Sequence, residues 1–118
     1  MAKKKSEPGP ASVSLERAGR LFRMLALLGA GPQTRSGLTR RLRLGVRGFY
    51  RDLEVLRQSG IDVTLGNGKY ILRQDATPAV ERLPFPDPGL TLGEARQLAR
   101  GRHEANKKIR EQLVKIEH

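Results

Sequence analysis

Apolar side chains recur every three or four residues from Leu15 onward, which predicts an amphipathic helix of about four turns. Ser14 is placed to cap its N-terminus, and residues 29–32, which contain two glycines and a proline, are placed to end it. A shorter helix is expected across residues 34–42, with Thr34 as its N-cap and two leucines four residues apart. The pattern therefore opens with two consecutive helices.

A third helix is predicted from about residue 46 to residue 59, where Gly60 is placed to stop it. Its apolar positions share one side at i, i+4 and i+7 and should face inward: Phe49, Leu53 and Leu56. The three helices together predict a trihelical core.

Two β-rich runs, at residues 61–65 and 69–73, follow this third helix directly. Between them lie Asn67 and Gly68, which tolerate the positive φ angles that a tight type I′ turn requires. This pattern predicts a β-hairpin. We therefore expect a mainly α (α+β) fold, a winged helix-turn-helix with a three-helix core and a β-hairpin wing.

Residues 75–90 contain four prolines, which predict an extended, semi-rigid linker and a domain boundary. Thr91 and Glu94 then have the spacing of a capping box, and one long helix is expected from there to about Ile116. The expected organisation is a flexible basic arm at 1–13, a winged helix-turn-helix domain at 14–74, the linker at 75–90 and a C-terminal helix at 91–118.

The charge balance points to a polyanionic partner. The 118 residues contain 23 Lys and Arg against 12 Asp and Glu, which gives a formal net charge of +11. No apolar run reaches the roughly 18 to 20 residues that cross a bilayer, and no apolar signal-peptide core follows the N-terminus. We expect a cytoplasmic, nucleoid-associated protein that binds nucleic acid. The absence of cysteine excludes disulfides and thiolate zinc sites.

Arginine is concentrated over the second and third predicted helices. Between residues 34 and 57 the basic residues are all arginine and outnumber Asp52 and Glu54 by seven to two: Arg35, Arg40, Arg41, Arg43, Arg47, Arg51 and Arg57. The planar guanidinium suits bidentate contact with phosphate or with the edge of guanine. In a helix-turn-helix the second helix of the pair lies in the major groove, so this cluster predicts a DNA-reading surface.

The N-terminal end of the third helix should enter the groove, because its side opposite the apolar stripe carries Val46, Arg47, Tyr50 and Arg51. We expect Arg47 and Tyr50 to contact base edges or adjacent phosphates and Arg51 to contact the phosphate backbone of the DNA. Gly45 at the N-cap leaves amide donors free for a phosphate. The alternative is that these arginines form a solvated face or pair with the neighbouring acidic side chains.

The wing should contact the DNA backbone or the minor groove through Lys69 near its tip and Arg73 at its base. Tyr70 more simply packs on the helices as an aromatic strand residue. The complete set of expected DNA-binding residues is Thr34, Arg35, Arg43, Val46, Arg47, Gly48, Tyr50, Arg51, Arg57, Asn67 and Lys69.

The segment from about residue 15 to residue 72, half of the chain, resembles the N-terminal winged-helix domains of WYL-domain transcription regulators, close to the DeoR-type helix-turn-helix. The recognition segment of that family reads Val-Ser-x-Arg-Thr, an aliphatic residue, a variable residue often Tyr, then Arg-Asp-Leu. Here Arg47 and the triplet at 51–53 match, while Gly45 replaces the capping serine and Gly48 the threonine. The wing ending Gly-Gly-Tyr-x-Leu is echoed at 68–72.

The resemblance implies a transcription regulator. Such proteins usually continue through a linker and a helix that opens like residues 90–95 into a ligand-sensing WYL domain, whereas this sequence stops at His118. We therefore expect no sensing domain and no small-molecule effector. The terminal helix should then present an apolar stripe that docks on its own winged domain or on a partner chain. We favour a homodimer through this helix, because paired half-sites raise affinity.

No enzymatic constellation is recognisable. The two histidines, His103 and His118, lack carboxylates at ligand spacing, and neither a glycine-rich phosphate loop nor a nucleophile elbow is present. We expect no catalytic residue, no metal and no cofactor. Two other functions are compatible with the charge: an RNA- or ribosome-associated basic protein, for which the aromatic content of 4% offers few stacking platforms, and a winged-helix protein-interaction module.

Overall fold

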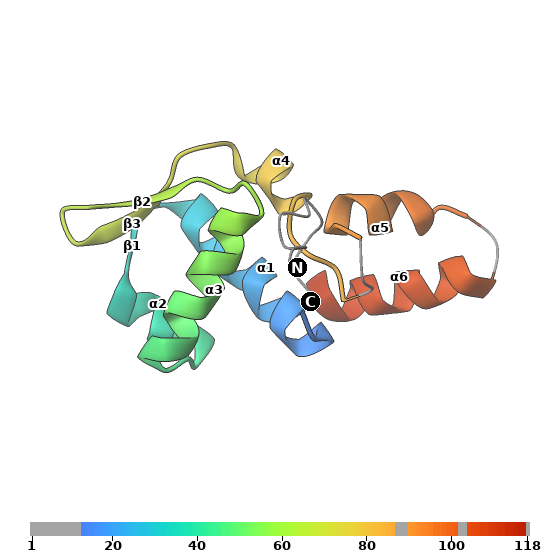
Figure 1. Cartoon of the computed structure of the whole chain (residues 1–118), viewed down its shortest axis with the longest axis horizontal. Coiled ribbons are helices and arrows are strands. Elements are labelled where there is room, and N and C mark those ends of the chain that lie inside the picture. Colours follow the sequence, from blue (N-terminus) through green and yellow to red (C-terminus); the bar gives the residue numbers. More distant parts are fainter. Residues whose placement is uncertain (1–12, 87–89, 102–103, 118) are drawn as a thin grey trace, which may run out of the picture.

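The computed structural model describes residues 13–86, 90–101 and 104–117 and is mainly helical, with a small antiparallel sheet (Figure 1). This confirms the α+β class. The elements in chain order are α1 (Leu15–Ala30), β1 (Gln33–Thr34), α2 (Arg35–Leu42), α3 (Val46–Gln58), β2 (Val63–Gly66), β3 (Lys69–Leu72), α4 (Ala76–Val80), α5 (Leu92–Leu98) and α6 (Glu104–Glu117).

The predicted helix starts are confirmed by their caps. The Ser14 hydroxyl accepts a hydrogen bond from the backbone N–H of Arg17 at 3.1 Å, and the Thr34 hydroxyl accepts one from Gly37 at 3.0 Å. Helix α3 begins after Gly45 without a side-chain cap, and Gly60 follows its end with a φ of +83°. Local sequence therefore sets these boundaries.

The β-hairpin is present as predicted. Strands β2 and β3 pair antiparallel around a two-residue turn in which Asn67 and Gly68 have φ angles of +53° and +75°. Strand β1 pairs with the other edge of β3, which gives the order β1-β3-β2. A two-residue strand carries no periodic signal, so the sequence did not indicate it.

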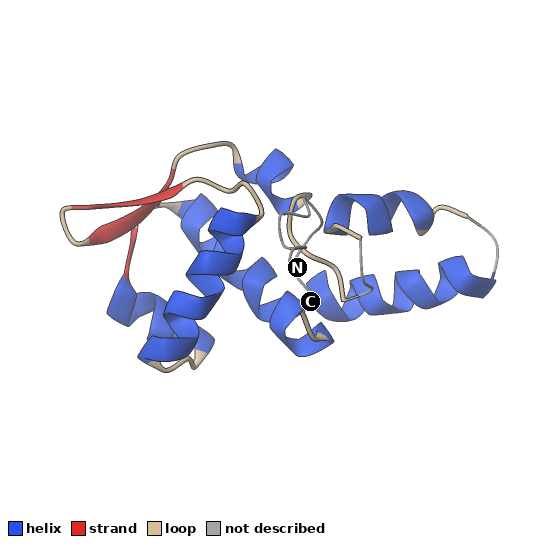
Figure 2. Ribbon diagram, viewed as in Figure 1, coloured by secondary structure: helices blue, strands red, loops and turns tan. Residues whose placement is uncertain are grey.

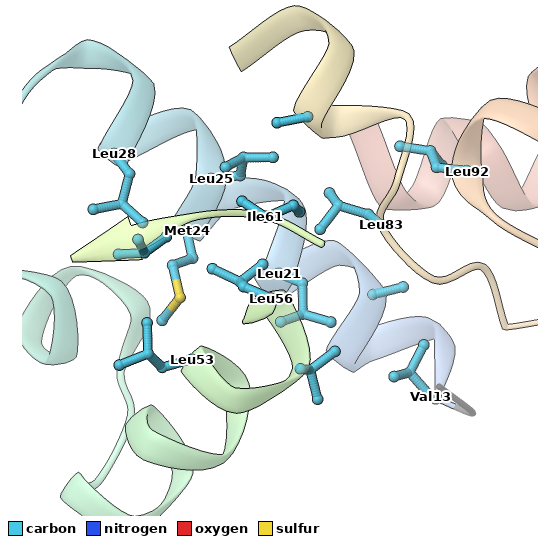
Figure 3. Close-up of a cluster of buried hydrophobic side chains, with 14 of the residues drawn as sticks. Val13, Leu21, Met24, Leu25, Leu28, Leu53, Leu56, Ile61, Leu83 and Leu92 are labelled. Atoms are coloured by element: carbon cyan, nitrogen blue, oxygen red, sulfur yellow. The ribbon is translucent and has the colours of Figure 1, made fainter. Parts of the chain in front are cut away.

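Helix α1 supplies much of the hydrophobic core (Figure 3). Its buried side chains, among them Leu21 and Met24, meet the apolar side of α3 at Leu53 and Leu56 and the residue Ile61 that precedes β2. The predicted inward side of α3 is thus confirmed. Helix α1 also packs against α6 in the C-terminal part of the chain.

The expectation of an extended linker at 75–90 is wrong for its described residues, 75–86 and 90. This stretch contains α4 and then places Leu83 and Phe85 in the core, each 1% exposed. The Leu92 N–H donates to the Leu83 carbonyl at 2.7 Å. Prolines remove backbone donors but do not prevent neighbouring apolar side chains from packing, so the segment belongs to the core and marks no boundary within it.

The expectation of one long C-terminal helix is also wrong. The predicted capping box is present, with Thr91 and Glu94 bonded reciprocally, but α5 ends at Leu98 and α6 folds back along it. Arg110 on α6 donates to the carbonyls of Ala99 and Gly101, each at 2.7 Å. These bonds satisfy carbonyls that a continuing helix would have used, which stabilises the break.

Part of the apolar stripe of this helix pair is covered within the chain. Leu113 and Ile116 on α6 are 8% and 1% exposed, and α6 packs against α1. The large apolar side chains of the pair that stay exposed in the structure are Leu98 and Val114. Of the two expected outcomes, docking on the chain's own winged domain or on a partner chain, the structure shows the first for these buried side chains, which pack on α1.

Two further expectations concern residues that lie wholly or partly outside the described ranges. The basic arm was expected at 1–13, but residues 1–12 lie outside the described residues and Val13 is buried at 8% exposure, so residue 13 belongs to the core. The two histidines at 103 and 118 also lie outside the described residues. No helix in the described ranges is both long enough and apolar enough to cross a membrane.

Candidate nucleic-acid interface

Helices α2 and α3 and the β-hairpin lie together at the end of the molecule opposite the α5–α6 pair (Figure 2). On α3, the predicted outward side is exposed: Val46 is 53% exposed, Tyr50 is 44% exposed, and Arg47 and Arg51 lie beside them. In the part of the chain that the structure describes, Arg47 and Arg51 have no ion-pair or hydrogen-bond partner on their side chains. Their guanidinium donors are available to a ligand.

Asp52 does not neutralise this surface. It is fully buried and accepts hydrogen bonds from Arg17 Nε at 2.8 Å and from Arg20 Nε and Nη2 at 2.6 Å and 3.2 Å. Hydrogen bonding to Asp52 raises the pKa of Arg20. The carboxylate therefore fixes α3 to α1, and the alternative in which Asp52 pairs with the outward arginines is not observed.

The clamp of Arg17, Arg20 and Asp52 was not recognised from the sequence. Phe49, Asp52, Leu53 and Leu56 have i, i+3, i+4 and i+7 spacing, which places Asp52 on the buried side of α3. An acidic residue on an apolar stripe needs a buried partner, so this spacing was the available signal. Its partners lie 32 and 35 residues away and carry no local signature.

Arg35 connects α2 to α3. Its Nη1 donates to the hydroxyl oxygen of Tyr50 at 3.0 Å, and this bond raises the pKa of Arg35 and lowers the pKa of Tyr50. Arg43 lies in the turn between the helices, exposed, with a left-handed φ of +55°. Both side chains are exposed, and their contact with DNA stays a prediction. Arg40 and Arg41 are exposed on α2 as well.

Three expected contact residues have neighbours within the fold, and their assignment to DNA stays a prediction. The Thr34 hydroxyl is engaged in capping α2. Arg57 Nη2 donates to the carbonyl of Val63 at 3.1 Å and so ties the end of α3 to β2. At Gly48, which is half-buried, an added Cβ would lie 3.2 Å from a methyl carbon of Leu44, so this position faces the α2–α3 turn rather than the outward surface.

The β-hairpin presents exposed groups at its tip and an anchored base. Asn67 and Lys69 are exposed, as is Leu65 at 59%. Tyr70 is buried, with its ring edge-on to Phe49 at 5.2 Å between centroids, which confirms that it packs on the helices. Burial raises the pKa of Tyr70, and the neighbouring Tyr50 adds to the rise.

A hollow of about 340 Å³ lies between the exposed part of the hairpin and the helices. It is lined by Arg35, Ser36, Tyr50, Leu65, Gly68 and Tyr70. The contributions of Ser36 and Leu65 were not predicted, because each follows from the folding of the hairpin over α2 and α3 and neither belongs to a local motif.

Comparison of the chain with protein-family models, with curated proteins and with solved structures finds no match. Within the described ranges, no three His, Cys, Asp or Glu side chains gather as a possible metal site. The basic surface and its hollow, which lie on α2, α3 and the β-hairpin, are therefore the features from which a function can be argued.

Proposed function

We propose that this chain is a sequence-specific double-stranded DNA-binding protein of the winged helix-turn-helix type. Helix α3 reads the major groove, and the β-hairpin acts as a wing on the backbone or the minor groove. The observation that carries the proposal is the outward side of α3, where Arg47 and Arg51 have no partner among the described residues while Asp52 is held by α1. Positive charge that is not neutralised internally is suited to phosphate and guanine.

The dimensions support this assignment. Helix α3 has 13 residues, or about 20 Å, and a helix of this kind fits the B-DNA major groove of roughly 12 Å width. Residues 43–45 form a short turn between α2 and α3. Val46 and Tyr50 lie among the arginines at the N-terminal end of α3, where an aliphatic side chain can contact a thymine methyl group.

The charge distribution favours the same surface. Residues 13–74 contain twelve Lys and Arg against four Asp and Glu, a formal +8, whereas residues 75–118 contain eight against seven, a formal +1. The excess charge therefore lies in the part that contains α2, α3 and the β-hairpin. Neutralising phosphates with these side chains releases counterions, which drives association with duplex DNA.

The resemblance to the WYL-type regulators makes transcription regulation the biological role that we propose. In the triplet that carries the resemblance, Arg51 is exposed, Asp52 is ion-paired and Leu53 is in the core. Self-association through the C-terminal helices remains a prediction; the large apolar side chains that these helices leave exposed in the described part of the chain are Leu98 and Val114.

Selection of bound duplexes from a random pool tests the proposal. We expect one enriched motif, bound about 10³-fold or more tightly than random duplex, with random-duplex binding that weakens steeply as salt increases. Duplex RNA of the same sequence is the comparison ligand and should bind more weakly, because its deep, narrow major groove excludes α3. Tighter binding to RNA, or no binding to any duplex at low salt, would contradict the proposal.

A further inference from the structure

Three elements meet around the hollow between the β-hairpin and the helices. Leu65 and the rings of Tyr50 and Tyr70 supply apolar surface, and Arg35 and Ser36 supply polar groups. None of the lining residues is acidic. The hollow thus combines a cation, a hydroxyl and an apolar wall at the edge of the proposed reading surface.

We propose that this hollow takes one sugar–phosphate unit of a DNA strand, with the deoxyribose against Leu65 and Tyr50 and the phosphate on Arg35 and Ser36. The inference depends on the proposed function and adds a contact between α3 and the wing. It gives roles to Leu65 and Ser36, which no helix-turn-helix pattern in the sequence indicates.

The geometry of Arg35 supports the phosphate contact. A guanidinium has five N–H donors in a planar fork, and Arg35 directs one nitrogen at the Tyr50 hydroxyl, 3.0 Å away. In the described part of the chain no carboxylate pairs with Arg35. The Tyr50 bond orients the guanidinium beside the hollow and leaves donors for the bidentate contact that phosphate favours.

The position of Leu65 supports the sugar contact. Leu65 pairs in register with Tyr70, and opposite residues in an antiparallel pair share a face, so Leu65 is on the side that faces the helices. It is nevertheless 59% exposed, because α2 and α3 leave the hollow beneath it. A deoxyribose would cover this aliphatic surface and remove it from water.

Photo-crosslinking tests the inference directly. Separate variants carry p-benzoylphenylalanine in place of Leu65, of Val46 on α3, or of Val114 on α6, and each is irradiated with a labelled duplex of random sequence. We expect adducts from positions 65 and 46 but not from position 114, with the position-65 adduct mapping to a sugar. Both Leu65 and Val114 are exposed aliphatic side chains, at 59% and 55%, so they are matched.

The outcomes separate the two claims. Crosslinking from position 46 alone would overturn the inference and leave the proposed function standing, whereas no crosslink from either position would contradict both. A position-65 adduct on a base, or equal crosslinking from position 114, would also overturn the inference.

Affinities for the same duplex give a second measurement. Leu65→Asn should weaken binding roughly threefold to tenfold, while Val114→Asn should change it less than about twofold. Arg35→Ala should weaken binding. It should also reduce the slope of log affinity against log salt concentration by about one, the amount expected for one phosphate contact. Inorganic phosphate should compete no better than chloride at equal ionic strength. Equal effects of the two Asn variants, or stronger competition by free phosphate, would overturn the inference.

Discussion

Residues 13–74 and residues 75–117 share one hydrophobic core but differ sharply in charge. The first part has an excess of eight positive charges, counting Asp52, which is buried and paired within it. Over residues 75–118 acidic and basic side chains nearly balance, and Arg96 is paired with Glu117 at 2.8 Å. The first part therefore has an excess of positive side chains that acidic side chains of the same part do not balance. In the second part, acidic side chains nearly balance the basic ones, and Arg96 is ion-paired within the chain.

This difference separates stability from binding. The C-terminal part contributes Phe85, Leu92, Ala95 and Ile116 to the core, each at most 1% exposed. The outward side of α3 contributes nothing to that core. Substitutions in the two regions should consequently change different quantities, and the first three of the following experiments compare a residue with a matched control.

The largest effect is expected from Phe85→Ala. Removing this buried ring should lower the free energy of unfolding by about 3 to 5 kcal/mol, measured by urea denaturation. Leu98→Ala, at an exposed position of α5, should change it by less than about 0.5 kcal/mol. A cost below about 1 kcal/mol for Phe85→Ala would mean that residues 75–90 act as the spacer that their prolines suggested.

Asp52→Asn should have the next largest effect. Loss of the carboxylate leaves Arg17 and Arg20 facing an uncharged side chain, and we expect a cost of about 2 to 3 kcal/mol, less than for a fully buried pair because these arginine side chains remain 22% and 24% exposed. Glu54→Gln, an exposed acidic position on the same helix, should leave stability unchanged and tighten duplex binding slightly. Similar stability losses in both variants would contradict the clamp.

Arg47→Ala should act on affinity alone. We expect a loss of about 1 to 3 kcal/mol on the selected duplex, with an unchanged unfolding midpoint, because the side chain is exposed. Arg100→Ala removes the same charge from the C-terminal part and should alter duplex affinity little. Fluorescence anisotropy with both variants measures the contrast, and equal losses would show that net charge rather than α3 determines binding.

Arg43→Gly should have a small effect on stability, opposite in sign to those of Phe85→Ala and Asp52→Asn. Glycine adopts the left-handed φ of +55° without the steric cost of a Cβ, so the folded state should gain about 0.5 to 1 kcal/mol, while the lost charge weakens duplex binding. Thermal unfolding and anisotropy together measure the pair of changes. A variant that is less stable would mean that the Arg43 side chain contributes contacts to the fold.

Much of the N-terminal part could be predicted because its signals are local. Ser14 and Thr34 cap helices within three residues of themselves, and the Asn67–Gly68 turn depends on two adjacent φ angles. The exposed positions of Arg47 and Tyr50 followed from the 3.6-residue period of α3. The intramolecular neighbours of Gly48 and Arg57, Leu44 and Val63, were not predicted, because the helical period does not reveal them.

The sequence by itself determined the helix caps, the β-hairpin turn and the basic side of α3, since these depend on residues a few positions apart. Only the tertiary structure decided that Asp52 binds α1, that Leu83 and Phe85 join the core, and that α6 folds back onto α1. Each of these depends on contacts between distant segments. Burial and ion pairing in the folded chain override local preferences there, because removing apolar groups from water is favourable and the ion pair offsets the cost of burying the Asp52 carboxylate.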